Sequence, residues 1–283
     1  MSVSFFVFGV VFDQYHYSQT KLNPVVMFVL KKRGTMRLPT MTGMIDRRML
    51  VNFRVEPEVL ARFLPAPFQP KLIHGYGMAG ICLIRLKGIR PTGLPAWLGV
   101  GSENAAHRIA VTWQENGTQK EGVYIPRRDS SSMLNHLVGG RIFPGYHHAA
   151  RFEVSEGNGN YSIHLESTDG DTRVSVQAQR STTLPATSIF HSLAEASAFF
   201  QGGALGYSAT PQKGIYDGLE LHTQTWHIEP LAVDAVESSF FADTIHFPLG
   251  SVTFDNALLM EQIAHEWRGH PSLWTAPQPT PCF

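Results

Sequence analysis

Three strand-like segments follow one another between residues 149 and 180 with almost no chain between them. They are AARFEVS, NYSIHLEST and DTRVSVQAQR, and the short segments GNGN and DGD separate them. Asn, Asp and Gly readily adopt the backbone conformations that tight hairpin turns require. Strands joined by such short turns run antiparallel. This stretch therefore predicts an antiparallel sheet, and it constrains the fold more than any other part of the chain.

Further apolar runs with strand character lie on both sides of these hairpins. In HRIAVTWQ, for example, Ile109, Val111 and Trp113 recur with the two-residue period of a strand. The runs expected to form strands are MLVNFRV (49–55), GMAGICLIRL (77–86), HRIAVTWQ (107–114), EGVYIP (121–126), LELHTQTWHIE (219–229) and SSFFADTIHF (238–247). Together with the hairpins they predict roughly nine strands.

Helical patterns are fewer. EPEVLARFL (56–64) begins with a proline in its first turn, and MLNHLVGGRIF (133–143) follows serines that can cap a helix. Ser192 and Glu195 have the spacing of a capping box before a third helix. DNALLMEQIAHEW (255–267) fits a helix, although a strand is not excluded.

The distribution of these elements predicts one structural domain. We see no internal repeat and no linker, so we expect a mostly antiparallel, barrel-like α+β domain over residues 43–270. Residues 1–42 are expected to be an appendage outside the core. Because Met36, Met41 and Met44 all precede the first regular pattern, this appendage is hypothesised not to be translated in the native protein. Residues 271–283 are rich in proline and are expected to form a loose tail.

Composition narrows the function classes. The 23 basic and 23 acidic residues cancel, so no overall field favours nucleic acid or an anionic membrane surface. The apolar runs near the N-terminus are too short to span a bilayer, and they lack the pattern of a secretory signal. The two cysteines, Cys82 and Cys282, form no disulfide framework. We expect a cytoplasmic protein that binds neither nucleic acid nor membrane.

Familiar catalytic and cofactor motifs are missing. HEWRGH (265–270) has its histidines five positions apart, so their rings would diverge on a helix rather than share a metal ion. The pairs His147-His148 and His222 with His227 lack a recognisable third ligand. There is no GxSxG nucleophile motif and no phosphate-binding loop. The sequence therefore predicts no metal and no cofactor.

Arginines near strand ends remain as candidates for chemistry. They are Arg47, Arg48, Arg127, Arg128 and Arg180. For any one of them a solvated charge or an ion pair at a strand end is the simplest interpretation. The pair that follows Pro126 is a better candidate for an anion clamp, because a guanidinium group matches a carboxylate in two-point geometry.

The chain resembles the acetoacetate decarboxylases. The resemblance is carried by IDRRMLVNFRVEPEVLARFLPAPFQP (45–70), by HGYGMAGICLIRLKGI (74–89) and by EGVYIPRRD (121–129). GVYIPRRDSSSML and YHHAARFEV are similar to the uncharacterised YqjF-like branch of the same superfamily. The resemblance spans about residues 45–265. It implies a cone-shaped, closed antiparallel barrel with a central cavity and a few flanking helices, and it implies that homo-oligomers can form.

The same resemblance argues against Schiff-base decarboxylation. Arg127 and Arg128 match the two lysines of the decarboxylases, of which the first forms the Schiff base and the second lowers its pKa. Arginine stays protonated and offers no free amine. The family's glutamate falls near Ile81, and only its arginine is retained, as Arg47. A lysine elsewhere could replace the lost amine, and the candidates are Lys87, Lys120 and Lys213.

We therefore expect a small carboxylate or oxo acid ligand in the cavity. Arg47, Arg127 and Arg128 are the expected anion-binding residues, with His148 or Glu121 as a proton carrier. One hypothesis is a cofactor-independent enzyme, a lyase, hydro-lyase or isomerase acting on a small carbonyl or carboxylate compound. A second is a non-catalytic small-molecule binding protein. In a third, the arginines only pair with acidic residues.

Overall fold

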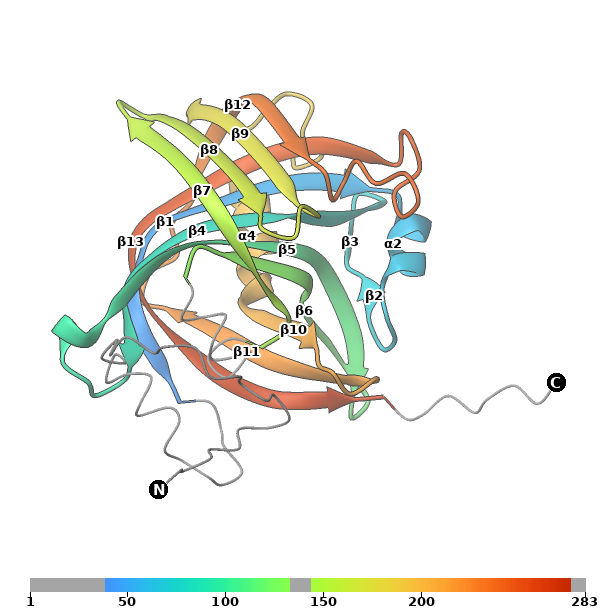
Figure 1. The fold of residues 1–283 in the computed structure, drawn as a ribbon. Coiled ribbons are helices and arrows are strands. Elements are labelled where there is room, and N and C mark those ends of the chain that lie inside the picture. The colour runs from blue at the N-terminus through green and yellow to red at the C-terminus, as the bar shows by residue number, and fades with distance from the viewer. Residues whose placement is uncertain (1–38, 133–143, 276–283) are drawn as a thin grey trace.

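Long strands that cross one another dominate the structure, a computed structural model that describes residues 39–132 and 144–275 (Figure 1). Its strands are β1 (Met41–Val55), β2 (Gln69–Pro70), β3 (Leu72–Ile73), β4 (Tyr76–Pro91), β5 (Val100–Glu115), β6 (Thr118–Ser130), β7 (His147–Gly157), β8 (Asn160–Ser167), β9 (Arg173–Arg180), β10 (Leu205–Ala209), β11 (Ile215–Thr223), β12 (Glu229–Ser238) and β13 (Val252–Trp274). The helices are α2 (Pro57–Phe63) and α4 (Leu193–Gln201), with short 3-10 helices η1 (Ala96–Leu98) and η2 (Gly202–Ala204). The described residues thus form mostly strand with few helices, as the sequence predicts.

The strand pairings close on themselves. β13 is 23 residues long, so it can pair with β1 along most of its length, with β12 near its start and with β11 near its end. From β13 the pairings run through β1, β4 and β5 to β6. They return to β13 by two routes, one through β10 and β11 and the other through β7, β8, β9 and β12. The result is a ring of strands.

Most neighbouring strands run antiparallel, and the predicted hairpins are present. β7, β8 and β9 pair in sequence order. Asn158 and Gly159 link β7 to β8 with positive φ angles of 52° and 78°, the backbone that the turn residues favour. The exceptions to the antiparallel pattern are β7 and β10, which both run parallel to β6.

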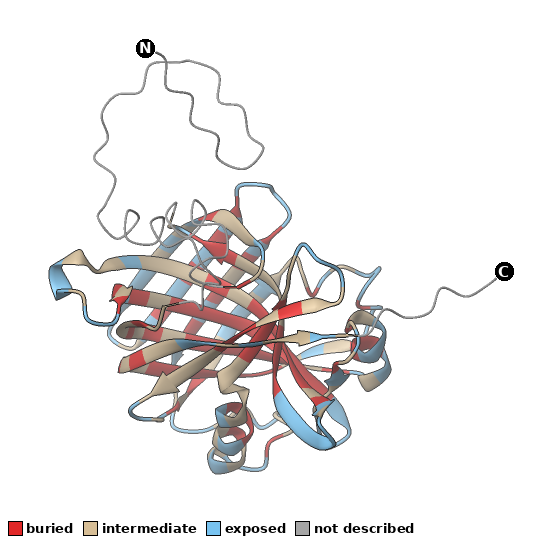
Figure 2. Ribbon diagram, turned by 90° about the horizontal axis from the view of Figure 1, so that it is seen from below, coloured by how far each residue is buried: buried red, intermediate tan, exposed pale blue. Residues whose placement is uncertain are grey.

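Two apolar clusters fill the molecule, and the central strands contribute to both. On β1, Met49 and Val51 belong to one cluster, whereas Leu50 belongs to the other. On β4, Ile81 and Leu83 alternate in the same way with their neighbours. Burial on both faces explains why these strands read as nearly continuous apolar runs. Figure 2 shows the buried residues along the crossing strands and the exposed ones mainly in peripheral helices and loops.

The two described helices match their sequence signals. Pro57 stands in the first turn of α2, whose buried residues are Val59 and Leu60. At α4 the Ser192 side chain accepts a hydrogen bond from the Glu195 backbone N–H, as a helix cap does. The helix expected at residues 133–143 lies outside the described residues.

Two expectations for the C-terminal third are wrong, and one open choice is decided. Residues 255–267, for which the sequence left both a helix and a strand open, lie within strand β13, because both edges of this segment find strand partners. Of residues 238–247 only Ser238, the end of β12, is in a strand, and the rest form turns whose aromatic side chains, such as Phe241, pack together instead of alternating along a strand. The run 219–229 is not one strand, since β11 ends at Thr223 and β12 begins at Glu229.

The strands also extend beyond the expected core boundaries. β1 begins at Met41, which is buried and pairs with both Pro91 and Trp267. β13 runs to Trp274, so residues 271–274 belong to the sheet and not to a loose tail. The tertiary pairing of both strands therefore sets these limits.

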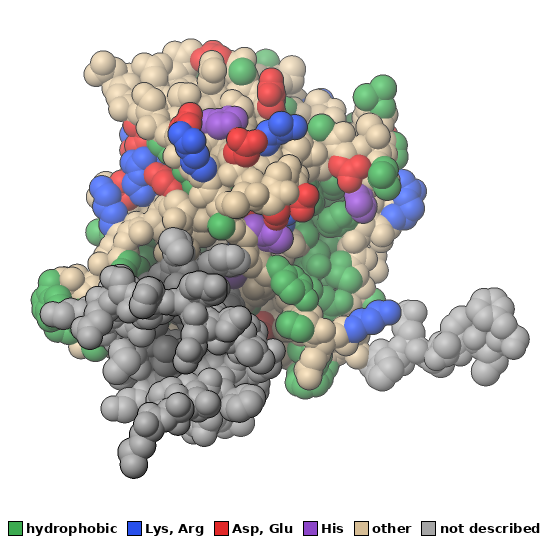
Figure 3. Space-filling model, viewed as in Figure 1, with side chains coloured by type: hydrophobic (Ala, Val, Ile, Leu, Met, Phe, Trp, Pro, Cys, Tyr) green, Lys and Arg blue, Asp and Glu red, His purple; other side chains and the backbone are tan. Residues whose placement is uncertain are grey.

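Charged side chains of opposite sign lie next to one another on the outer surface. In the upper part of Figure 3, Lys and Arg side chains alternate with Asp and Glu. This mixture agrees with the zero net charge and with the many surface ion pairs. Within the part of the chain that the structure describes, no helix has the length and apolar character needed to cross a membrane.

Candidate functional site

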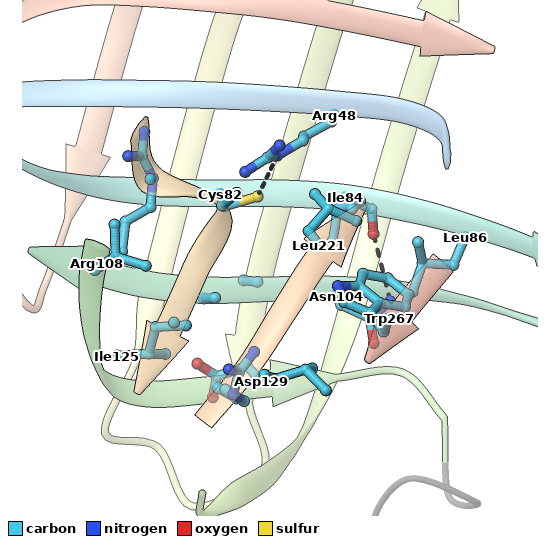
Figure 4. A pocket seen from close by; sticks show the side chains of 18 of the residues that line it. Arg48, Cys82, Ile84, Leu86, Asn104, Arg108, Ile125, Asp129, Leu221 and Trp267 are labelled. Carbon is cyan, nitrogen blue, oxygen red and sulfur yellow. Dashed lines mark hydrogen bonds between the residues drawn. The ribbon is translucent and has the colours of Figure 1, made fainter. Parts of the chain in front are cut away.

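A pocket of about 110 Å³ lies within the ring, between the central strands (Figure 4). One part of its lining is apolar and includes Ile84, Leu86, Leu219 and Leu221. The polar and sulfur-containing side chains of the lining are those of Arg48, Cys82, Asn104, Arg108, Arg128, Asp129, His147 and Trp267. Three arginines around a small, largely apolar space make this pocket the candidate site.

Arg127 and Arg128 are adjacent in β6, so their side chains lie on opposite faces of the strand. Arg127 donates hydrogen bonds from Nη2 to Asp129 Oδ1 at 2.9 Å and to Asp169 Oδ1 at 3.0 Å. Arg128 lines the pocket, and its buried Nε has no hydrogen-bond partner among the described residues. Burial lowers the pKa of Arg128 to about 10, so the group stays charged at neutral pH.

Arg47 and Arg48, adjacent in β1, likewise comprise one arginine held in ion pairs and one that lines the pocket. Arg47 is almost fully buried and bound to two carboxylates, Glu103 at 2.6 Å and Glu156. Arg48 lines the pocket, where its Nε lies 3.4 Å from Cys82 Sγ and its Nη1 lies 3.9 Å from Met260 Sδ. Thioether and thiol sulfur atoms are weak acceptors, so most of the hydrogen-bonding capacity of Arg48 is left for another partner.

Arg108 in β5 is the most enclosed of the three pocket arginines. Its side chain is buried, and its Nη2 donates to the neutral Asn52 Oδ1 at 2.5 Å. Its Nε finds no hydrogen-bond partner in the part of the chain that the structure describes, and its guanidinium carbon lies 5.2 Å from the centre of the Phe200 ring. Burial lowers the pKa of Arg108 to about 10, which still leaves it charged at neutral pH.

Most of the other described arginines are paired with a carboxylate, whereas the pocket arginines are not. Among the described residues, the arginines that form ion pairs with carboxylates are Arg47, Arg54, Arg85, Arg127, Arg151, Arg180 and Arg268. Arg48, Arg108 and Arg128 form no such pair with any described carboxylate. The pocket therefore gathers positive charge that the described protein groups do not neutralise.

Besides the arginines and the Cys82 thiol, two residues of the lining carry titratable groups. Asp129 is buried, and this burial raises its carboxyl pKa although Arg127 opposes the shift. Both of its oxygens accept hydrogen bonds from Arg127. His147, at the start of β7, is the second titratable group beside the arginines.

The structure separates the predicted site residues. Of the five, only Arg128 lines this pocket. Arg47 and Arg127 are held in ion pairs, as described above. Glu121 is bound to Lys71 at 2.8 Å, and His148 Nδ1 lies 2.6 Å from Asp169 Oδ2. These four residues do not line this pocket together with Arg128, and alternation along β1, β6 and β7 turns Arg47, Arg127 and His148 to the other face from the lining residues beside them.

Two pocket arginines were not in the predicted set. Arg48 is among the arginine candidates of the sequence but not among its expected anion-binding residues, because strand periodicity without a partner strand cannot tell which of Arg47 and Arg48 faces inward. Arg108 lies within the apolar strand run HRIAVTWQ, directly before Ile109. A charged residue within an apolar run that is buried on both faces of its strand is the sequence signal that could have identified Arg108.

Similar structures support the fold. The acetoacetate decarboxylase of Legionella pneumophila matches with a TM-score of 0.56 and 9% identity over 93% of this chain and 98% of that one. An acetoacetate decarboxylase-like enzyme from Sphingomonas wittichii RW1 gives 0.50 and 11%, over 85% and 94%. The enduracididine biosynthesis enzyme MppR, complexed with the condensation product of pyruvate and imidazole 4-carboxaldehyde, gives 0.51 and 12%, over 84% and 90%.

Sequence comparison identifies the family more directly. A comparison with curated proteins finds no match. The model of one family, described as an uncharacterized conserved protein (COG2071), matches residues 43–250, which is most of the chain. The chain therefore belongs to the DUF2071 family, and its fold is similar to that of the acetoacetate decarboxylases.

Proposed function

We propose that the pocket binds a small carboxylate or oxo acid through Arg48, Arg108 and Arg128. The observation that carries this proposal is the absence of a carboxylate partner for any of the three among the described residues. Holding a charge away from water without a counter-charge costs several kcal/mol. An anionic ligand offsets that cost, and a carboxylate matches the two-point geometry of a guanidinium group.

The dimensions and the lining favour a small ligand. A cavity of about 150 Å³ is large enough for benzene, so a pocket of about 110 Å³ suits a molecule of only a few non-hydrogen atoms. Ile84, Leu86 and Leu221 form an apolar wall for its carbon atoms, while the arginines bind its charged end. We propose that the ring of strands is the cone-shaped barrel of the superfamily and that this pocket is its central cavity.

Binding is proposed to occur without a Schiff base. Among the described residues no lysine lines the pocket. Of the lysines considered as substitutes, Lys87 is bound to Asp46 at 2.7 Å. The arginines, with pKa values of about 10 for Arg108 and Arg128, stay protonated at neutral pH and cannot act as amine nucleophiles. MppR, which shares the fold, has been solved with a pyruvate condensation product, and this supports an oxo acid as the ligand class.

Turnover by acid-base chemistry is the second candidate function. It rests on Asp129, a residue of the lining whose carboxyl pKa is raised by burial, since a catalytic acid or base must change its protonation state. That carboxyl bonds to Arg127 on the face of β6 opposite to Arg128. The reaction would be a cofactor-independent lyase, hydro-lyase or isomerase step on the bound acid. Because Arg127 already engages both carboxylate oxygens of Asp129, simple binding has the stronger support.

A thermal-shift screen tests the binding proposal. The ligands are acetoacetate, pyruvate, other oxo acids, plain carboxylates and phosphate, at concentrations up to about 100 times the dissociation constant. Such a ligand should add about 2.7 kcal/mol, which raises the melting temperature by a few degrees in a domain of this size. Arg48→Met, Arg108→Met and Arg128→Met should each lose the response to the acid that stabilises the wild type.

Arg62→Met is the matched control, because Arg62 is exposed on α2 and does not line the pocket. It should respond as the wild type does. An equal response in all four variants, or no response of the wild type to any acid, would exclude the proposed site. A ligand found in this way is then incubated with wild type and Asp129→Asn, and its consumption by the wild type alone would establish turnover.

A further inference from the structure

Two histidines and a glutamate that are far apart in the sequence lie together beside α4. His74 occupies the turn between β3 and β4, His191 directly precedes the capping residue of α4, and Glu195 lies in its first turn. The ligand atoms of the three side chains all lie within 4.8 Å of one another. By contrast, the two histidines of HEWRGH, both in β13, have separate partners, since His265 packs on Trp267 and His270 bonds to Tyr207 of β10.

We propose that His74, His191 and Glu195 bind a zinc ion. Two imidazole nitrogens and one carboxylate oxygen are a donor set that zinc accepts, with a fourth position left for water. Hard cations such as Mg²⁺ and Ca²⁺ prefer oxygen ligands throughout, so the two histidines select against them. This site is separate from the arginine pocket, and the inference does not depend on the proposed function.

The distances are close to those that zinc requires. His74 Nε2 lies 2.7 Å from Glu195 Oε1, and the ring centres of His74 and His191 lie 4.4 Å apart. Zinc ligands lie about 2.0–2.1 Å from the metal, so tetrahedral neighbours are about 3.3 Å apart. Small side-chain rotations therefore bring the three ligand atoms into place. His74 and His191 are exposed, so an ion can reach them from solvent.

The surrounding contacts orient the glutamate and one histidine. The second carboxylate oxygen, Glu195 Oε2, accepts a hydrogen bond from the His191 backbone N–H at 2.7 Å. The Glu195 backbone N–H in turn donates to Ser192 Oγ at 3.1 Å. His74 has a positive φ of 48°, a conformation uncommon outside glycine, and Gly75 continues the turn at 82°. Contacts of this kind around a metal site hold its ligands in position.

A bound ion would join two distant parts of the chain. His74 and Glu195 are 121 positions apart, so the ion would tie the β3–β4 turn to the start of α4. The chain continues from α4 into η2, where Gly203 and Ala204 line the arginine pocket. The ion would therefore hold in place a helix that leads directly to that pocket.

Zinc titration of the full chain tests the proposal. Protein stripped with EDTA and then freed of it is titrated with ZnCl₂ by calorimetry, and its melting temperature is measured with and without zinc. The wild type should bind one more equivalent of Zn²⁺ than His74→Ala or His191→Ala, and zinc should raise its melting temperature by a few degrees. MgCl₂ in place of ZnCl₂ should produce neither effect.

His246→Ala is the matched control. His246 is also an exposed histidine bound to a carboxylate, Asp243 at 2.6 Å, but within residues 39–132 and 144–275 no third ligand joins this pair. The control should keep the additional equivalent. In crystals soaked with ZnCl₂, the anomalous signal of the ion should lie between His74, His191 and Glu195. Equal zinc binding by wild type and both alanine variants, or an anomalous signal only elsewhere, would overturn the proposal.

Discussion

Arg128 lines the pocket, whereas Arg127, its neighbour in the chain, is bound to Asp129 and Asp169 on the opposite face of β6. The two guanidinium groups therefore have different physical roles. Arg127 balances the charge of a buried carboxylate. Arg128 leaves a positive charge in the pocket without a counter-charge from the described residues.

Replacing each of these two arginines should have opposite consequences. Arg127→Met should lower the free energy of unfolding by about 3 kcal/mol, because Asp129 then stays buried without its partner. It should keep the response to the ligand. Arg128→Met should lose that response with little loss of stability. Urea unfolding and thermal shift, measured on both variants, check the pair, and a matching profile for the two would contradict the assignment.

Arg108→Met should stabilise the free protein. Arg108 is buried with a neutral asparagine as partner, and an apolar side chain of similar length avoids the cost of its desolvation. We expect the free energy of unfolding to rise by about 1 kcal/mol while anion binding is lost. A fall of more than about 2 kcal/mol in urea unfolding would mean that Arg108 serves the fold rather than the ligand.

Stability should fall as the pH drops below neutrality, in part because of two buried histidines. Burial lowers the pKa of His107 to about 3 and that of His265 to about 4, from 6.5 in each case. Between these values and 6.5 the unfolded chain binds protons that the folded protein does not. Above pH 6.5 both histidines are neutral in the folded and in the unfolded protein, so they cost no stability there. The free energy of unfolding decreases as the pH falls from 6.5 toward 4.

The size of this effect can be measured on one residue. Each proton that the unfolded chain binds and the folded protein does not changes the free energy of unfolding by about 1.4 kcal/mol per pH unit. In His107→Phe, which can keep the ring contact with Phe240, the slope of unfolding free energy against pH should decrease by that amount between about pH 4 and 6. His246→Phe, at an exposed position, serves as the control. An unchanged slope in His107→Phe would show that His107 is not held neutral.

Cys82 should report whether the pocket is occupied. It lines the pocket and is 8% exposed, and the chain contains only one other cysteine, Cys282. In a Cys282→Ser background, a ligand bound to the arginines should slow alkylation of Cys82 by iodoacetamide several-fold. Mass spectrometry measures the rate. Protection that persists in Arg128→Met would place the ligand elsewhere.

Local sequence signals predicted the elements that depend on short-range interactions. The hairpins around Asn158 and Gly159, the capped start of α4 at Ser192 and the proline in the first turn of α2 all follow from backbone preferences of a few neighbouring residues. These signals failed where distant strands decide. Residues 255–267 fit a helical pattern, yet pairing with β1 and β11 makes them a strand.

The site shows the same limit. The sequence indicated an arginine-based anion site and the loss of the lysine pair, because residue types alone determine which groups stay charged. It could not tell Arg48 from Arg47, since the face that a side chain occupies depends on which strand lies against it. His74 and Glu195 show no relationship in the sequence at all, and only the packing of α4 beside the β3–β4 turn brings them together.

The sequence by itself determined the strand-rich class, the turns, the helix ends and the chemistry available to each side chain, since these depend on residues close in the chain. The tertiary structure decided how β13 closes the ring, which arginines face the pocket and which are neutralised by carboxylates. Those outcomes depend on contacts between distant segments, such as Arg47 with Glu103, 56 positions apart, and Thr42 of β1 with His265 of β13, 223 positions apart. No local pattern in the chain encodes such contacts.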